Sequence, residues 1–151
     1  MKKVSLFISL LLLSPLALFG GGPYNLEGIQ ALNVLVIDEN KAVSPQMKEK
    51  IAQALKQKLE KNGIKSKKEG VGTLFVKIYS TKVDKTSVVY INFGVGEESR
   101  IQRAGSVESF VISYNNEDMI SGQDVEGEVY DSVVNFLMDE FLEQFHEDNE
   151  E

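Results

Sequence analysis

Hydrophobic and polar positions alternate along the chain in two periods, which predict strands in some segments and helices in others. Residues 32–38, LNVLVID, form a compact β-branched run that ends in polar residues, as a buried strand does. Further along, apolar side chains recur every four positions, which gives a helix one apolar face. Ser44 before Pro45 is a typical helix start and Gly63 a typical stop, so the pattern predicts a helix over residues 45–62.

The middle of the chain is typical of β-structure. Three runs rich in β-branched and aromatic residues predict strands, and they cover residues 73–83, 87–95 and 107–114. The Asp84-Lys85 turn joins the first two into a hairpin, and the polar residues 100–105 are turn-like. We expect the third strand to end at the turn-forming Asn115-Asn116. Residues 64–68 fit either a short strand or an extended connector.

The last periodic segment predicts a helix from about Gln123 to His146. Its apolar arc is wider than the stripe of about 100° that a helix on a sheet needs. Either the helix is wedged between the sheet and the first helix, or its second side is a dimer or partner interface. Met and Phe at helical spacing are usually core, which favours the first explanation. The residues that would form the interaction surface in the second are Tyr130, Val134, Met138, Phe141, Leu142 and Phe145.

The order of these elements, β-α-β-β-β-β-α, predicts the α+β class. We expect a mixed, mainly antiparallel sheet of four to five strands with two helices packed on one face. No internal repeat or linker divides the chain, so residues 23–151 are expected to form a single domain that ends in an acidic, frayed C-terminal tail.

Residues 1–22 have the pattern of a secretory signal peptide. Lys2 and Lys3 provide the positive start, an apolar run follows, and Ser14-Pro15 interrupts it. The apolar run is shorter than the roughly 20 residues that a spanning helix needs. We therefore expect cleavage, no stable membrane span afterwards, and a product in the periplasm or outside the cell. The alternative is an uncleaved N-terminal membrane tether.

Composition excludes several kinds of chemistry. The 151 residues include no Cys and one His, so the chain has no disulfide, no thiolate nucleophile and no Cys-based or two-His metal motif. The formal net charge of −7 argues against nucleic acid as a partner, because such binding needs clustered positive charge. We predict no cofactor.

Charge is divided along the chain. Twelve Lys stand against four acidic residues between Lys41 and Lys85, whereas fourteen acidic residues and no basic ones follow Arg103. One interpretation is intramolecular, with the acidic closing helix beside the basic first helix; each surface pair then adds only about 0–1 kcal/mol. The other is that the acidic end meets a basic partner or a cation. Exposed charge is usually solvated, which favours the first.

Candidate catalytic and ligand-binding residues are few. His146 lies near the C-terminus, where a general base has little to orient it. No nucleophile elbow or phosphate-binding loop is present, so we expect no enzymatic activity and no catalytic residues. The acidic pairs Glu97-Glu98 and Glu117-Asp118 are expected in loops, where their oxygens could bind a small ligand or a Ca²⁺-type cation.

In element order the chain is similar to small envelope domains such as the N-terminal domain of the translocation protein TolB or the lipopolysaccharide-assembly lipoprotein LptE. These place a strand–helix unit beside a short sheet, although the lipid-anchor Cys of the lipoproteins is absent here. We expect a small, exported, non-catalytic accessory or protein-interaction domain of the bacterial cell envelope. Its expected partner is another envelope protein or a second copy of itself in a homodimer. The alternative is a small-ligand or cation-binding domain that uses the acidic loops.

Overall fold

The computed structural model describes residues 25–67, 72–102, 105–123 and 125–150, so the expected signal peptide lies outside the described residues. Five strands form one sheet in the order β2-β1-β3-β4-β5. The strands are β1 (Ala31–Asp38), β2 (Lys65–Ser66), β3 (Gly72–Val83), β4 (Thr86–Ile101) and β5 (Val107–Gly122). β1 pairs in parallel with β2 and β3, whereas β3, β4 and β5 are antiparallel. The predicted α+β class with a mixed sheet is confirmed.

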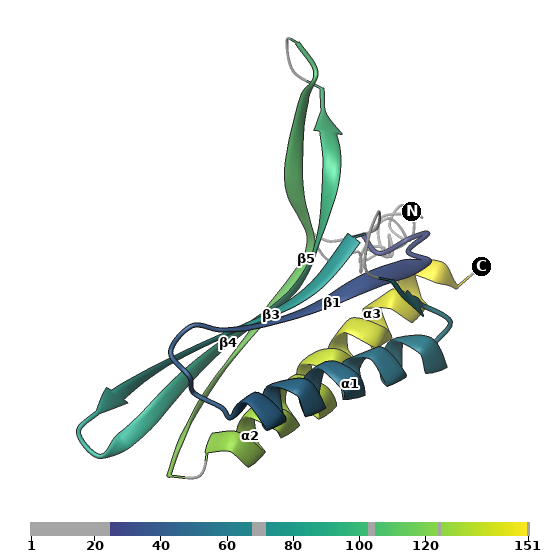
Figure 1. Cartoon of the computed structure of the whole chain (residues 1–151). Helices are drawn as coiled ribbons and strands as arrows, with labels where there is room; N and C mark the ends of the chain where they lie inside the picture. Colours follow the sequence, from purple (N-terminus) through teal and green to yellow (C-terminus); the bar gives the residue numbers. More distant parts are fainter. Residues whose placement is uncertain (1–24, 68–71, 103–104, 124, 151) are drawn as a thin grey trace, which may run out of the picture.

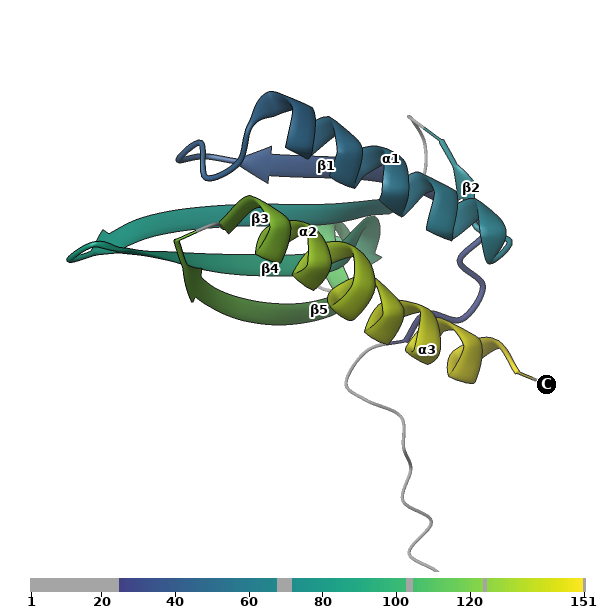
Figure 2. The same cartoon turned by 90° about the horizontal axis from the view of Figure 1, so that it is seen from below.

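Two helices lie side by side in one layer over one face of this sheet, and no helix among the described residues covers the other face (Figures 1 and 2). Helix α1 (Pro45–Lys61) begins at Ser44, whose hydroxyl accepts a hydrogen bond from the Met47 amide at 3.2 Å. The C-terminal helix consists of α2 (Val125–Asp131), a π-helical turn η1 (Ser132–Leu137) and α3 (Met138–Asn149). The prediction of two helices on one face is therefore confirmed.

The hydrophobic core lies between the sheet and these helices. Helix α1 contributes its buried Ile51, Leu55 and Leu59, as its four-residue period predicted. The rings of Phe93 and Tyr114 project from the sheet towards Phe141 of α3, with centroids 6.1 and 5.3 Å from the Phe141 centroid. All three side chains are buried, so this aromatic cluster joins the C-terminal helix to β4 and β5.

Strands β4 and β5 are longer than predicted. The sequence placed strand ends near Val95 and Tyr114, but β4 continues to Ile101 and β5 to Gly122. Asn115-Asn116 lie within the paired strands, as do Arg100 and Ile101 of the expected turn, whereas Gly105 is in a turn as predicted. β5 continues past Asn115 because this residue has partners on the neighbouring strand. It lies opposite Gly94 of β4, and its side chain accepts a hydrogen bond from Asn92. A local pattern does not reveal such a partner.

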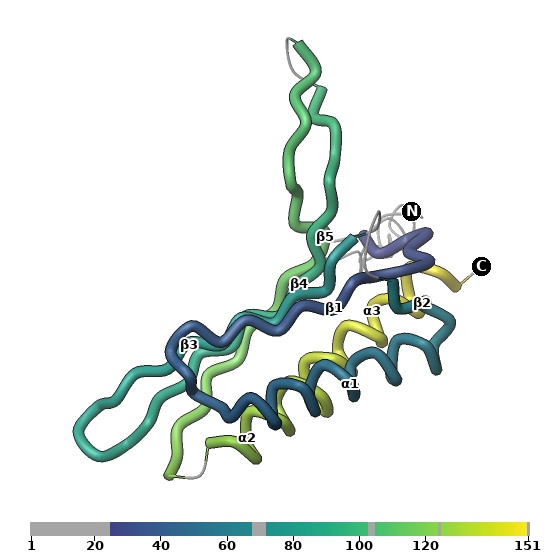
Figure 3. The backbone as a smooth tube through the Cα atoms, in the orientation of Figure 1, coloured from purple at the N-terminus to yellow at the C-terminus, as the bar shows by residue number. Residues whose placement is uncertain are grey.

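A two-stranded arm extends from the sheet as a result (Figures 1 and 3). β3 ends its pairing with β4 at Gly96, and beyond this point β4 pairs with β5 alone. The β4–β5 register shifts between Val95 and Gly96, and such a bulge bends the ribbon. We call residues 96–101 and 107–112 the arm. It projects from the side of the sheet that lacks helices.

The C-terminal tail, which was predicted to fray, is helical and hydrogen-bonded. α3 runs to Asn149, and Asp148 accepts a hydrogen bond from the Leu26 amide at 2.8 Å. Asn149 donates to the Leu26 carbonyl at 3.1 Å. The buried Leu26 side chain joins the core, so these bonds hold both ends of the described chain together. No helix among the described residues is long and apolar enough to cross a membrane.

Candidate functional site

The arc that the sequence offered as an interaction surface on the closing helix is part of the core. Val134, Met138, Phe141 and Leu142 are buried. The two remaining members, Tyr130 and Phe145, are half-buried and pack against the same cluster. The helix lies beside α1 and packs against both α1 and the sheet, which agrees with the core explanation, so its wide apolar arc leaves little surface for a partner.

The acidic residues predicted in loops lie in strands and do not converge. Glu97 and Glu98 are in β4, and Glu117 and Asp118 are in β5. Neighbouring side chains in a strand point to opposite faces. Asp118 accepts a hydrogen bond from Ser132 of η1 at 2.6 Å on the helix side. In the described part of the chain, no three His, Cys, Asp or Glu side chains are grouped closely enough to hold a metal ion.

The charge division along the sequence becomes a division between two sides of the molecule. Helix α1 lies over β1, whereas α2 and α3 lie over β4 and β5 (Figure 2). One ion pair joins the basic and acidic helices, since Lys58 Nζ lies 2.6 Å from Asp139 Oδ1. The same ammonium donates to the Val134 carbonyl in η1 at 2.7 Å. The helices therefore lie side by side, as the intramolecular interpretation requires.

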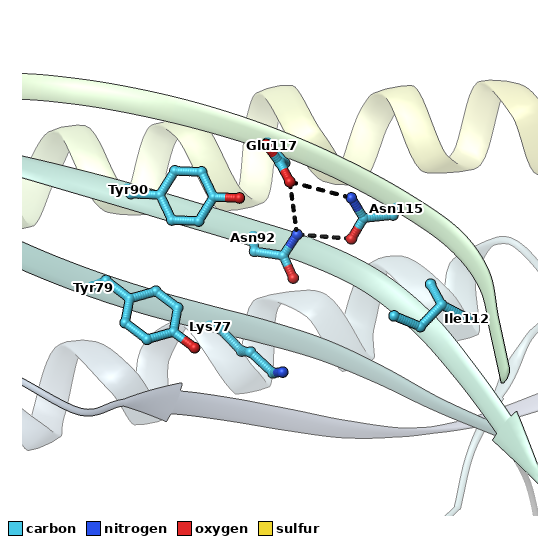
Figure 4. A pocket seen from close by; sticks show the side chains of 7 residues that line it. All are labelled: Lys77, Tyr79, Tyr90, Asn92, Ile112, Asn115 and Glu117. Carbon is cyan, nitrogen blue, oxygen red and sulfur yellow. Dashed lines mark hydrogen bonds between the residues drawn. The ribbon is translucent and has the colours of Figure 1, made fainter. Parts of the chain in front are cut away.

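The face of the sheet without helices presents polar and aromatic side chains, and we call it the open face. A shallow depression of about 740 Å³ lies on it (Figure 4). Strands β3, β4 and β5 and the base of the arm supply its lining, which consists of Lys77, Tyr79, Tyr90, Asn92, Ile112, Asn115 and Glu117. Helices are visible behind the sheet in this view, so these side chains point away from the core.

The polar groups of the open face are engaged with one another. Asn92 Nδ2 donates to Asn115 Oδ1 at 2.7 Å, and Glu117 Oε1 lies 3.5 Å from the amide nitrogens of both Asn side chains. A hydrogen bond with Glu117, assisted by partial desolvation and by the carboxylate charge, raises the pKa of Tyr90 above 10.0. The polar side chains of the open face are therefore joined to one another by hydrogen bonds.

Exposed apolar side chains gather on the arm. Val107, Phe110, Val111 and Ile112 all expose more than a third of their surface. Alternate residues of a strand face opposite ways, so these four place apolar groups on both faces of the ribbon. The Phe110 ring lies directly over Gly96, and a Cβ there would come within 2.1 Å of the ring. Gly96 thus leaves room for the tip of the ring against the opposite strand.

Sequence reasoning missed both the open face and the arm. Val89, Ile91 and Phe93 alternate along the strand predicted over residues 87–95, and all three are buried in the core. Tyr90 and Asn92 lie between them and point to the other face, where the sequence suggested no site. A signal was present, because Tyr79 and Tyr90 are large aromatic residues at positions of the polar face. Their rings are neighbours, with centroids 6.2 Å apart.

Taken together, these features define an α+β protein with a helix layer on one face, a polar–aromatic open face on the other, and a projecting hairpin arm. No family model matches the chain, and no curated protein matches it in sequence. Solved structures resemble it at low identity.

A point variant of the PelC dodecamer from Paraburkholderia phytofirmans has a TM-score of 0.44 and 14% identity, over 78% of this chain and 89% of that chain. The PelC dodecamer in another crystal form gives 0.43 and 12%, over 78% and 90%. Rare lipoprotein B from Shewanella oneidensis gives 0.26 and 6%, over 76% and 91%. Scores and identities this low carry no argument about function.

Proposed function

We propose that this chain is a small, exported, non-catalytic interaction module of the cell envelope that contacts a protein partner through its arm. The observation that supports this most is the set of exposed apolar side chains at Val107, Phe110, Val111 and Ile112. Exposed apolar groups that gather in one place mark interaction surfaces far more often than scattered ones do. An isolated two-stranded ribbon is marginally stable in water, so the arm gains stability from a partner.

Unpaired strand edges give the arm a second means of binding. β5 is the last strand of the sheet, and the distal part of β4 extends beyond β3. Both edges of the ribbon therefore expose backbone amides and carbonyls to a partner. Such edges accept an additional strand, where main-chain hydrogen bonds supply affinity and alternate side chains supply specificity.

The character of the polar groups favours a non-catalytic role. His146 lies on the exposed surface of α3, with Nε2 2.9 Å from Asn62 Oδ1 and no nucleophile beside it in the hydrogen bonds of the described chain. Tyr90 and its hydrogen-bond partner Glu117 lie on an open surface, and the pKa of Tyr90 is raised. General acid–base catalysis needs a group whose pKa lies near the working pH. Export rests on the pattern of residues 1–22.

Site-specific photo-crosslinking tests the proposal in cells that export the full chain. A photoreactive amino acid replaces Val111 on the arm, and in a control it replaces Gln57 on the exposed surface of α1. We expect the arm position to give discrete crosslinked protein products and the helix position to give none. Equal yields from the two positions contradict the proposal, because the arm then contacts partners no more than any exposed surface does.

A further inference from the structure

Two tyrosine rings cover part of the open face. Tyr79 of β3 and Tyr90 of β4 are in register, and their ring centroids are 6.2 Å apart with the ring planes tilted by 35°. Side chains on a strand usually stand out from the sheet, but Figure 4 shows both rings lying over the strands with their faces turned away from the helices. The pair therefore presents a broad aromatic surface rather than ring edges.

Hydrogen-bonding side chains form the next row along the strands. Lys77, Asn92 and Glu117 are in register across β3, β4 and β5. Two residues along each strand separate this row from the tyrosines, a distance of about 7 Å. An aromatic surface and a row of polar groups therefore lie side by side in the depression of about 740 Å³. Ile112, at the base of the arm, lines the same depression, so the projecting arm bounds it on one side.

The hydrogen bonds of this row orient its side chains and leave part of their bonding capacity unused. Asn92 Nδ2 donates to Asn115 Oδ1 at 2.7 Å, which turns Asn92 Oδ1 towards β3 (Figure 4). This oxygen accepts no hydrogen bond within the described part of the chain. An amide that one bond already holds in place can bind a ligand through its other atom with little further loss of side-chain entropy.

The charges in the depression favour a neutral ligand. Lys77 and Glu117 are its only charged lining residues, and their charges cancel. Anionic ligands such as nucleotides are bound by clustered cations, and this site has a single one. A sugar combines an apolar C–H face with a rim of hydroxyl groups. It therefore matches an aromatic surface that lies beside amide and carboxylate groups.

We infer that the open face binds a neutral oligosaccharide whose chain crosses the strands. Neighbouring strands are about 4.8 Å apart, which is close to the length of one sugar residue in an extended chain. Successive sugars then stack on Tyr79 and Tyr90, while their hydroxyl groups reach Asn92 and Glu117. A shallow, nearly flat surface fits β-1,4-linked chains, which are extended, better than α-1,4-linked chains, which curl. This ligand site goes beyond the protein contact proposed for the arm.

Isothermal titration calorimetry of the exported protein with three neutral hexasaccharides tests the inference. Cellohexaose and N-acetylchitohexaose are extended β-1,4 chains, and maltohexaose is the α-1,4 control. Because the depression is shallow, we expect a dissociation constant of about 0.1–1 mM for at least one extended chain, and no heat with maltohexaose. Tyr79→Ala and Tyr90→Ala should each weaken binding at least about fivefold. Phe136→Ala removes an exposed ring from the helix layer and should leave binding unchanged.

Nuclear magnetic resonance provides a second readout that needs no substitution. When the parent protein is titrated with the two extended chains, the side-chain amide signals of Asn92 and Asn115 should shift, while that of Gln57 on the exposed surface of α1 should not.

The results that overturn the inference are equally specific. They are no heat from either extended chain at millimolar concentration, equal heat from maltohexaose, tyrosine variants that bind as the parent does, or amide shifts confined to other residues. Crosslinks from Val111 decide the proposed arm contact separately, because neighbouring side chains alternate and Val111 points away from the face of the arm that carries Ile112.

Discussion

Replacement of Phe141 by Ala tests whether the C-terminal helix is core or surface. Phe141 is fully buried, and its ring contacts Phe93 and Tyr114 at centroid separations of 6.1 and 5.3 Å. Removal of a buried Phe costs about 3–5 kcal/mol, and aromatic pairs add about 0.5–1.5 kcal/mol each beyond area burial. We therefore expect a loss near 4–5 kcal/mol, a large part of the 5–15 kcal/mol typical of a whole domain.

Urea denaturation followed by far-UV circular dichroism measures this loss. Phe136→Ala is the matched control, because Phe136 lies on the same helix but is 48% exposed. We expect the control to change the free energy of unfolding by about 1 kcal/mol or less, with the slope against urea unchanged in both variants. Equal effects of the two substitutions, or altered association with unaltered stability in Phe141→Ala, would refute the assignment of this helix to the core.

Three further predictions concern backbone space, a bridging cation and a titrating group. Gly94→Ala should destabilise the protein by about 1–3 kcal/mol, because the added Cβ would lie 2.7 Å from the Tyr114 carbonyl oxygen. The Cβ added by Gly127→Ala would have no atom within 4 Å, so this control should stabilise α2. Thermal unfolding of the two variants compares their stabilities. Lys58→Met should cost about 1–2 kcal/mol by denaturation, since it removes the Asp139 ion pair and the bond to the Val134 carbonyl, while Lys61→Met should cost less than about 0.5 kcal/mol. The raised pKa of Tyr90 means that the folded state holds this proton more tightly, so its contribution to stability is lost as pH rises above 10.0 through the folded pKa. Glu117→Gln should lower the Tyr90 pKa in a spectrophotometric titration, and an unchanged alkaline midpoint would contradict this.

The sequence predicted an element correctly where the residues that determine it are close together in the chain, as in α1 and β1. The Ser44 cap and the four-residue period placed α1 within one residue of its observed bounds. The same holds for β1, where a β-branched run ends in a polar loop. The class and the placement of both helices on one face followed from element order.

Features that depend on partners distant in sequence could not be predicted this way. Asn115 was expected in a turn, because Asn favours turns when nothing else satisfies its side chain. In the structure its amide bonds to Asn92, 23 residues away, and the strand continues. The width of the apolar arc on the closing helix was likewise ambiguous until the position of α1 was known. The acidic pairs looked local but alternate between the two faces of the sheet.

Hydroxyl-radical footprinting tests the central claim that this protein contacts its partner through the arm. Phe110 on the arm and Phe136 on the helix layer are 57% and 48% exposed, so both should be oxidised in the dilute, purified protein. In cells that export the chain, we predict that Phe110 is protected while Phe136 is still oxidised. Protection of Phe136 with continued oxidation of Phe110 would show that the helix layer is the contact surface and would contradict the account.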